Sequence, residues 1–323
     1  MHYERLFLLV CMAGLLAGTT LAAGIVVALG GTFRRAIVGR APRNRARLLF
    51  SLRVSPFGAG LIASIGVAAA FIRHEPRNTT EEAGAMLLLA CGSTLVLLWL
   101  AARRAIEVSA RTRACHRLIR QHGQQVDIPE FPIPVWRIRS AFPVAAVAGL
   151  LRPRLILSSR ILDGCEDDEV LAVLRHERAH VDHRDNLMRA CLVCLPDPLA
   201  FSKTGAALVA EWHEAVEEAA DDAASGMDER ARVTLAGTLV RVARMANDAP
   251  PDWMPALALF DGDNLEARVR RLLEPEPAAS RPQPVTSIAG ALGVSFLVAG
   301  ALWTAAGPRP LHDIVEWAVR SLP

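Results

Sequence analysis

The sequence predicts a mainly α integral membrane protein with four transmembrane helices and a cytoplasmic α+β domain inserted between the third and the fourth. Three observations support this fold class. The chain of 323 residues is 52% hydrophobic, with a mean hydropathy of +0.28, which is too apolar for an ordinary soluble enzyme. Several apolar runs are long enough to cross a bilayer. Arginines cluster at the ends of these runs, as they do on the cytoplasmic side of membrane proteins.

Four apolar segments are predicted to span the membrane, at residues 6–30, 54–72, 83–102 and 285–306. The first is longer than the apolar core of a typical signal peptide and has one arginine before it, which favours a retained span over a cleaved signal. The second is rich in Gly and Ala, and such small residues allow helices to pack closely in lipid.

The positions of the arginines predict the orientation in the cell membrane. A short predicted loop at residues 33–53 carries seven arginines, and a second group follows the third span. Short basic loops stay in the cytoplasm, so we expect both termini outside the cell. The net charge of +3 comes without a nucleic-acid-binding motif, which argues against direct nucleic acid binding. The expected domains are three spans over residues 1–102, a cytoplasmic domain over 103–284, and the fourth span with a short external tail over 285–323.

One stretch of the cytoplasmic domain has a pattern with a specific chemical use. His176 and His180 are four residues apart, and Glu177 directly follows the first. Acidic residues at 166–169 and the spacing of apolar residues at 170–174 predict a helix, which places both imidazoles on one face. Two neutral imidazoles suit zinc, and a carboxylate beside the open coordination position can take a proton from bound water. We therefore expect zinc on His176 and His180, with Glu177 as the catalytic base.

A second predicted helix offers the third ligand that a zinc site needs. The stretch from Glu211 to Ala224 is rich in Ala and Glu and lacks Gly and Pro. We expect Glu217 as the ligand, and Asp221, one turn later, as the carboxylate that holds the second ring nitrogen of a ligand histidine. The pair formed by Glu218 and Asp222 has the same spacing and is the main alternative.

The rest of the domain shows weaker signals. Short β-like runs separated by Pro and Gly predict a small antiparallel sheet, and its edge is suited to pairing with an extended peptide. The apolar stretch at residues 187–201, broken by two prolines, is expected to form a buried turn rather than to dip into the membrane surface. Cys191 and Cys194 are expected to be buried thiols rather than a metal or redox site. The predicted strands are residues 135–139, 144–150 and 155–158, and further helices are expected at 233–246 and 265–273.

The chain resembles the integral-membrane zinc metallopeptidases of the BlaR/MecR type, which belong to β-lactam-sensor systems, and more distantly the HtpX/Ste24-type membrane proteases. The likeness is most specific at Ala148–Leu157, at Leu174–His180 and at Arg184–Leu187, and the segment from Glu217 to Asp221 is similar to the third-ligand segment of that family. It implies a gluzincin-like zincin domain, with His176, His180 and Glu217 as zinc ligands and Glu177 as the base.

The resemblance also implies an endopeptidase that acts in signal transduction, either on a cytoplasmic protein such as a transcriptional repressor or on itself. No penicillin-binding sensor domain is expected in this chain. The alternative is a membrane signalling or scaffold protein in which a structural zinc site is closed by a fourth protein ligand. For the tetrahedral oxyanion of peptide cleavage, His183, Arg184 and His213 are candidate donors, although a surface or ion-pairing role is the simpler expectation for each.

Overall fold

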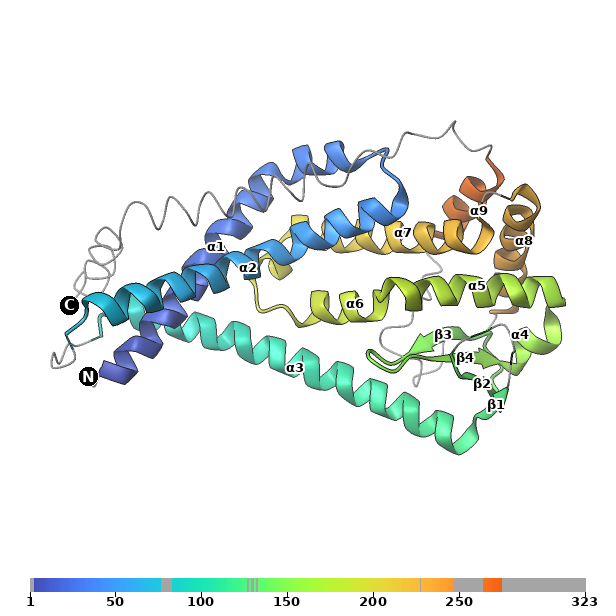
Figure 1. The fold of residues 1–323 in the computed structure, drawn as a ribbon, viewed down its shortest axis with the longest axis horizontal. Coiled ribbons are helices and arrows are strands. Elements are labelled where there is room, and N and C mark those ends of the chain that lie inside the picture. The colour runs from blue at the N-terminus through green and yellow to red at the C-terminus, as the bar shows by residue number, and fades with distance from the viewer. Residues whose placement is uncertain are drawn as a thin grey trace.

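The computed structural model describes residues 3–76, 83–126, 128, 131, 133–226, 228–246 and 264–274. Within them, three helices are long and apolar enough to cross a membrane: α1 (Tyr3–Ile37), α2 (Pro42–His74) and α3 (Ala85–His122). Figure 1 shows that these helices extend from one end of an elongated molecule, and that a small sheet lies at the other end. The predicted fourth span and the tail after it lie outside the described residues.

Helices α1 and α2 cross at small residues. A Cβ atom added to Gly18 would lie 2.6 Å from the Cβ of Ala63, and one added to Gly60 would lie 2.5 Å from Cγ2 of Thr19. The two backbones therefore approach more closely than side chains at these positions would allow, as expected for the Gly- and Ala-rich second span.

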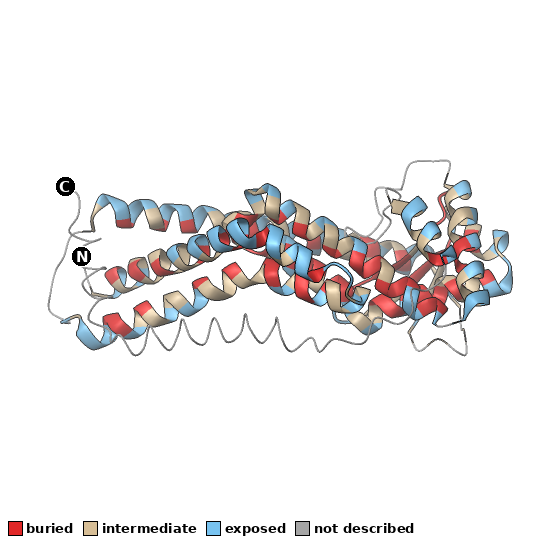
Figure 2. Ribbon diagram, turned by 90° about the horizontal axis from the view of Figure 1, so that it is seen from above, coloured by how far each residue is buried: buried red, intermediate tan, exposed pale blue. Residues whose placement is uncertain are grey.

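The apolar side chains of these helices are exposed to a large extent. Leu21 on α1, Ile65 on α2 and Leu89 on α3 each have between 68% and 70% of their surface exposed. Figure 2 shows exposed and half-buried residues along the ends of α1, α2 and α3 that lie away from the sheet. Large exposed apolar surfaces require a nonpolar environment, so these helices are consistent with a membrane protein.

The predicted basic loop at residues 33–53 is instead mostly helical. Helix α1 continues to Ile37, and α2 begins at Pro42. The polar extensions of both helices pack on α7 (Lys203–Ser225) and on the segment before it, where three of the arginines form ion pairs with acidic residues. These are Arg34 with Glu211, Arg45 with Glu218 at 3.0 Å, and Arg53 with Asp197 at 2.7 Å. These contacts favour a continued helix over a solvated loop.

Helix α3 does not end at the predicted domain boundary but continues for twenty residues beyond position 102. Its last turns bury Cys115 and Ile119 against the sheet, together with Ile138, Val144 and Ile156. One helix therefore belongs to both a candidate span and the core of the sheet domain.

The sheet has four strands in the order β1-β2-β4-β3, with β1 at Gln124–Val126, β2 at Val135–Ile138, β3 at Ala145–Ala148 and β4 at Arg154–Ser158. The prediction of an antiparallel sheet was wrong, because β4 inserts between β2 and β3 and runs parallel to β2. Three of the strands were predicted from the sequence, whereas β1, which is short and largely exposed, showed no signal. Strand β3 is left at an edge of the sheet.

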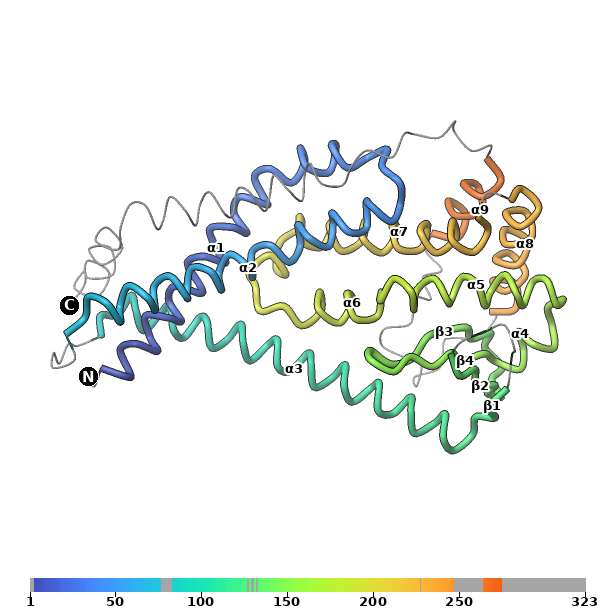
Figure 3. The backbone as a smooth tube through the Cα atoms, viewed as in Figure 1, coloured from blue at the N-terminus to red at the C-terminus, as the bar shows by residue number. Residues whose placement is uncertain are grey.

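The helices of the domain follow the sheet: α4 (Ser159–Gly164), α5 (Asp167–His183), α6 (Asp185–Cys194), the 3-10 helix η1 (Pro198–Phe201), α7, α8 (Glu229–Met245) and α9 (Leu265–Leu273). Figure 3 shows α5 and α6 running end to end, with α7 beside them and α8 and α9 at the far end of the domain. The predicted helix at residues 265–273 coincides with α9.

The apolar stretch at residues 187–201 forms most of α6 and the turn into η1. Leu192, Leu195 and Leu199 are buried in one cluster with Trp212 of α7, which agrees with the expected buried turn. The thiols behave differently from the expectation, since Cys191 is exposed and Cys194 is only half-buried.

Candidate metal centre

Helix α5 is held in place at its start and along one face. The side chain of Glu169 accepts a hydrogen bond of 2.9 Å from the backbone nitrogen of Glu166, and the side chain of Glu166 caps the first turn in return. Leu174 packs into the cluster of buried residues on the sheet that includes Leu155 and Leu157. The helix thus begins at a defined residue and rests on the sheet, which directs its opposite face toward α7.

That opposite face carries His176 and His180, and both side chains are buried. Their Nε2 atoms point at each other across 3.2 Å, and the two rings are nearly perpendicular. Glu217 of α7 completes the group: its Oε2 lies 3.5 Å from Nε2 of His176, and its Oε1 lies 3.8 Å from Nε2 of His180. One ligand atom from each residue lies within 4.8 Å of the others.

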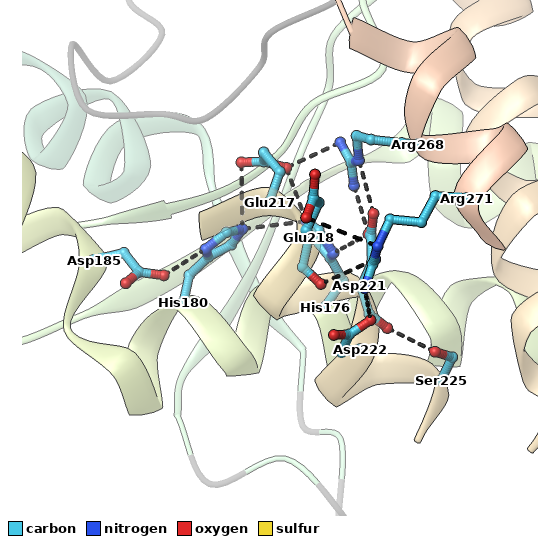
Figure 4. A network of polar contacts seen from close by, with 10 residues as sticks. All are labelled: His176, His180, Asp185, Glu217, Glu218, Asp221, Asp222, Ser225, Arg268 and Arg271. Atoms are coloured by element: carbon cyan, nitrogen blue, oxygen red, sulfur yellow. Dashed lines mark hydrogen bonds and ion pairs between the residues drawn. The ribbon is translucent and has the colours of Figure 1, made fainter. Parts of the chain in front are cut away.

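The outer nitrogens of the two histidines face carboxylates. Nδ1 of His176 lies 3.0 Å from Oδ1 of Asp221, and Nδ1 of His180 lies 2.8 Å from Oδ2 of Asp185. Figure 4 shows the second contact at the edge of the site. These carboxylates fix the ring orientations and direct each Nε2 inward, which is the usual arrangement around a metal-binding histidine.

The sequence predicted this position for Asp221 but assigned no contact with a ligand histidine to Asp185. Asp185 is five residues after His180 and would not face it on a regular helix. Arg184, between α5 and α6, adopts a left-handed conformation with φ of 59°, and this break turns Asp185 back toward the histidine. The neighbouring Asn186 donates a hydrogen bond of 2.8 Å to the carbonyl of Val147, which ties the start of α6 to β3.

Arg268 of α9 is the charged residue of the site that sequence reasoning missed. Its Nη1 lies 2.9 Å from Oε2 of Glu217, and it donates to both oxygens of Asp221, from Nε at 2.9 Å and from Nη2 at 2.7 Å (Figure 4). A usable signal was present, because Arg268 shares a helix face with the apolar Leu265 and Leu272, and an arginine on such a face needs a buried partner.

The alternative pair of acidic residues faces another direction. Glu218 lies 3.0 Å from Arg45 of α2 and 3.8 Å from Arg271 of α9, and Asp222 contacts Arg271 as well. In Figure 4 both lie on the side of α7 next to Arg271. The structure therefore brings Glu217, and not Glu218, to the two histidines.

The pKa values of the site reflect burial and charge. Burial opposes the charged form of His176, but the hydrogen bonds with Asp221 and Glu217 outweigh it and raise the pKa of His176 to about 10. Burial would raise the pKa of Glu217, yet His176 and Arg268 lower it to about 2. Burial also raises the pKa of Glu177, against the opposing effect of His180 and His176. Glu177 is thus the carboxylate of the site that binds a proton most readily.

The donor set fits a metal ion such as zinc. Two imidazole nitrogens and a carboxylate are ligands that zinc accepts, and three of them leave one tetrahedral position open. Oε2 of Glu217 is paired with Arg268, whereas Oε1 is buried and has no hydrogen-bond partner among the described residues. Buried polar atoms are normally satisfied, so a cation bound between Glu217 and the two histidines would account for Oε1.

The three candidate oxyanion donors lie in different places. Arg184 is the left-handed residue between α5 and α6, and His183 at the end of α5 lines a cavity with Arg43 of α2. His213, one turn before Glu217, lines a cavity of about 320 Å³ with Glu217 and Arg268. Burial, followed by Arg189, lowers the pKa of His213 to about 4, which keeps it neutral near pH 7. His213 therefore shares a cavity with the candidate ligand Glu217, and Arg184 shares one with His180.

Comparison with known proteins gave one family. Residues 109–248 match the model of peptidase family M48, which indicates a metallopeptidase. No curated protein and no solved structure matched the chain. The family agrees with the more distant of the two resemblances drawn from the sequence, and the specific BlaR/MecR type is not confirmed by it. Residues 109–248, which contain both helices of the site, thus match peptidase family M48, and the chain is consistent with a membrane metallopeptidase of that family.

Proposed function

We propose that this chain is a zinc-dependent endopeptidase, held in the cell membrane by its apolar helices, that cleaves a cytoplasmic protein in signal transduction. The observation that carries the proposal is the convergence of His176, His180 and Glu217 on one point beside Glu177. A repressor or the chain itself is the substrate class that the sequence resemblance implies. The membrane orientation, with both termini outside, rests on the arginine pattern.

The residues of the site have distinct tasks in this proposal. His176, His180 and Glu217 hold the zinc, while Asp221 and Asp185 keep each imidazole in the tautomer that leaves Nε2 free to bind it. When bound, zinc would lower the pKa of a water molecule and polarise the scissile carbonyl. The carboxylate of Glu177 would take a proton from a water molecule in the site and deliver it to the leaving amine nitrogen. Burial raises the pKa of Glu177 in the direction of the working pH, which favours its action as a base.

Strand β3 is placed to hold the peptide. It lies at the edge of the sheet, and Ala145 lines the same cavity as His176 and Glu177. An extended peptide that pairs with this edge would run past the site, held by its backbone. The carbonyl of Val147 already accepts a hydrogen bond from the side chain of Asn186. The backbone hydrogen bonds between β3 and the peptide would therefore centre on Ala145.

The alternative function is a membrane signalling or scaffold protein with a structural zinc site. Such a site needs a fourth protein ligand. Among the described residues, the group that could hold a metal has three members, which favours an open position and catalysis.

Two measurements test the proposed function. The first is the zinc content of the purified protein in detergent, where we expect about one zinc per chain, retained by Glu218→Ala and lost from Glu217→Ala. The second is proteolysis by Glu177→Gln, which should keep its zinc and lose its activity. Full activity in Glu177→Gln would show that this carboxylate is not the base, and absence of zinc from the intact protein would refute the proposal.

A further inference from the structure

A cavity of about 210 Å³ lies between the first turns of α2 and the junction of α5 with α6. Three arginines line it: Arg43 and Arg47 of α2, and Arg184 at the junction. All three residues are exposed, so the cavity is accessible from solvent. Arg43 and Arg47 are four residues apart, which places them on one side of the helix. Two segments that are distant in the sequence thus bring three positive charges to one cavity.

These arginines differ from their neighbours in having no partner. Among the described residues, the side chains of Arg43, Arg47 and Arg184 form neither an ion pair nor a hydrogen bond. On the same helix, Arg45 pairs with an acidic residue of α7, and Arg53 pairs with one just before η1. The arginines of α2 that face acidic groups are therefore paired, whereas those at the cavity keep their donors free.

The acidic residues of the cavity wall are engaged elsewhere. Asp185 lies 2.8 Å from Nδ1 of His180, and Asp182 contacts Arg178 at 3.4 Å. Burial lowers the pKa of His183, the remaining ionisable group among the described residues of the wall, so its ring is neutral near pH 7 and can donate one N–H. The wall thus carries three arginines against two aspartates that face other partners, which favours an anion in the cavity.

Two helices begin beside this cavity. Helix α2 starts at Pro42 and α6 starts at Asp185, and among the described residues no side-chain hydrogen bond caps either start. The start of a helix carries partial positive charge and free backbone N–H groups, both of which attract anions. The two helix starts therefore add to the attraction that the arginines exert on a negative charge.

We propose that this cavity binds a phosphate group, held by Arg43 and Arg47 on one side and by Arg184 on the other. Guanidinium groups match the geometry of phosphate oxygens and bind them through paired hydrogen bonds. A cavity of roughly 150 Å³ holds a molecule of the size of benzene, so about 210 Å³ has room for a phosphate and part of the group esterified to it. The inference is independent of the proposed peptidase function, because it uses none of the candidate metal ligands.

The headgroup of a membrane lipid is the nearer source of such a phosphate. Arg47 is seven residues before the predicted second span at residues 54–72, which places it about 10 Å from the apolar core along the helix. The headgroup layer extends about 5–8 Å beyond that core, and the long side chain of an arginine can cover the remaining distance. Basic pockets beside membrane helices bind anionic headgroups in this way. A soluble phosphate compound offers the same chemistry, so the experiment has to separate the two sources.

The test measures the binding of two probes to the full chain purified in a nonionic detergent. The probes are dioctanoyl phosphatidylglycerol, measured by native mass spectrometry, and inorganic phosphate, measured by titration calorimetry. Arg43→Gln combined with Arg47→Gln should raise the Kd of the bound probe by about tenfold or more, because charge-assisted hydrogen bonds are lost. Tighter binding of the lipid would identify a membrane ligand, and tighter binding of inorganic phosphate would identify a soluble one.

A matched double variant controls for net charge. Arg35→Gln combined with Arg40→Gln removes the same charge near the same end of the membrane helices, but neither residue lines the cavity. Each of these two arginines donates to the carbonyl four residues earlier in the chain, which leaves other segments unaffected. This control should bind the probe as wild type does.

A variant in the other wall keeps the inference testable if the double variant of α2 does not fold. Arg184→Asn removes the third charge, and asparagine tolerates the left-handed conformation at this position, where φ is 59°. It should raise the Kd of the same probe by about fivefold or more.

Three outcomes would overturn the inference. They are no binding of either probe by wild type, an equal loss of binding in the cavity variants and in the matched control, and wild-type binding in Arg184→Asn. A loss that is confined to the variants of Arg43, Arg47 and Arg184 would place the phosphate in this cavity, whether or not the protein cleaves peptides.

Discussion

The guanidinium group of Arg268 lies against both carboxylate oxygens of Asp221, at 2.7 and 2.9 Å, while that carboxylate faces Nδ1 of His176 at 3.0 Å. A residue of α9 thus orients a candidate metal ligand of α5 through a carboxylate of α7. Two buried carboxylates, those of Asp221 and Glu217, contact this guanidinium group. Their positions therefore depend on a planar donor that can form paired hydrogen bonds.

Arg268→Lys keeps the positive charge but loses the paired hydrogen bonds to Asp221. Partners that orient a ligand typically change metal affinity by about 10- to 100-fold, so we expect zinc affinity to fall by that factor. Competition with a chromogenic chelator measures it. Arg270→Lys is the control, because Arg270 is exposed and pairs with Glu266 on its own helix. Equal zinc affinity in Arg268→Lys and wild type would show that Arg268 does not position the ligands.

Asp185→Asn tests the contact that orients His180. The amide retains the shape of the side chain but accepts a weaker hydrogen bond from Nδ1, so zinc affinity should fall by about tenfold or more. The same chelator assay measures it. Asp182→Asn is the matched control, since Asp182 is exposed and contacts Arg178 one turn earlier. If both variants bind zinc as wild type does, Asp185 only ends the helix.

Zinc affinity should increase with pH. The pKa of His176 in the metal-free site is about 10, so the ring carries a proton at neutral pH, whereas Glu217, with a pKa of about 2, is ionised throughout. Zinc binds the neutral imidazole and must displace that proton, so affinity should rise about tenfold per pH unit between roughly pH 6 and 9. Titration calorimetry in buffers of different ionisation enthalpy reports the released proton. An affinity independent of pH would show that His176 is neutral before the metal binds.

Removing either Arg53 or Asp197 alone should strongly destabilise the protein, because the remaining charge would be buried without a partner. Both side chains are buried, with 3% and 0% exposed. Arg53→Ala leaves a buried, unpaired carboxylate, and we expect a loss of about 3–5 kcal/mol in the free energy of unfolding. Thermal unfolding in detergent measures the change. Arg47→Ala, at an exposed arginine of the same helix, should be close to neutral.

A double replacement provides the complementary result. Arg53→Met combined with Asp197→Leu removes both charges and should recover most of the stability, because an apolar pair of similar volume avoids the cost of burying ions. A double variant as unstable as Arg53→Ala would mean that the loss comes from packing rather than from the unpaired charge.

Much of the site could be predicted from the sequence because its residues recur with the period of a helix. His176 and His180 are four residues apart, as are Glu217 and Asp221, and such local spacing survives in the folded structure. The existence and the bounds of α9 could also be predicted from the sequence, since its apolar residues lie on one face of the helix.

The other contributions depend on contacts between distant segments. Asp185 reaches His180 only because Arg184 breaks the helix, and Arg268 reaches Glu217 only because α9 packs beside α7. The arginines of residues 33–53 resemble a solvated loop until their partners on α7 are known. Similarly, the alternation of apolar and polar residues in β2 and β3 does not indicate that β4 lies between these two strands.

The ion pairs that join α1 and α2 to α7 connect the candidate metal ligand Glu217 to two helices that are long and apolar enough to cross a membrane. Glu218 holds Arg45 and directly follows Glu217, so a tilt of α2 either carries Glu217 with it or breaks the pair. Such coupling works in both directions, because two events that share one element bias each other by the same free energy. Lipid composition and bilayer thickness would then change the affinity for zinc, and zinc binding would in turn change the tilt of the helices in the bilayer.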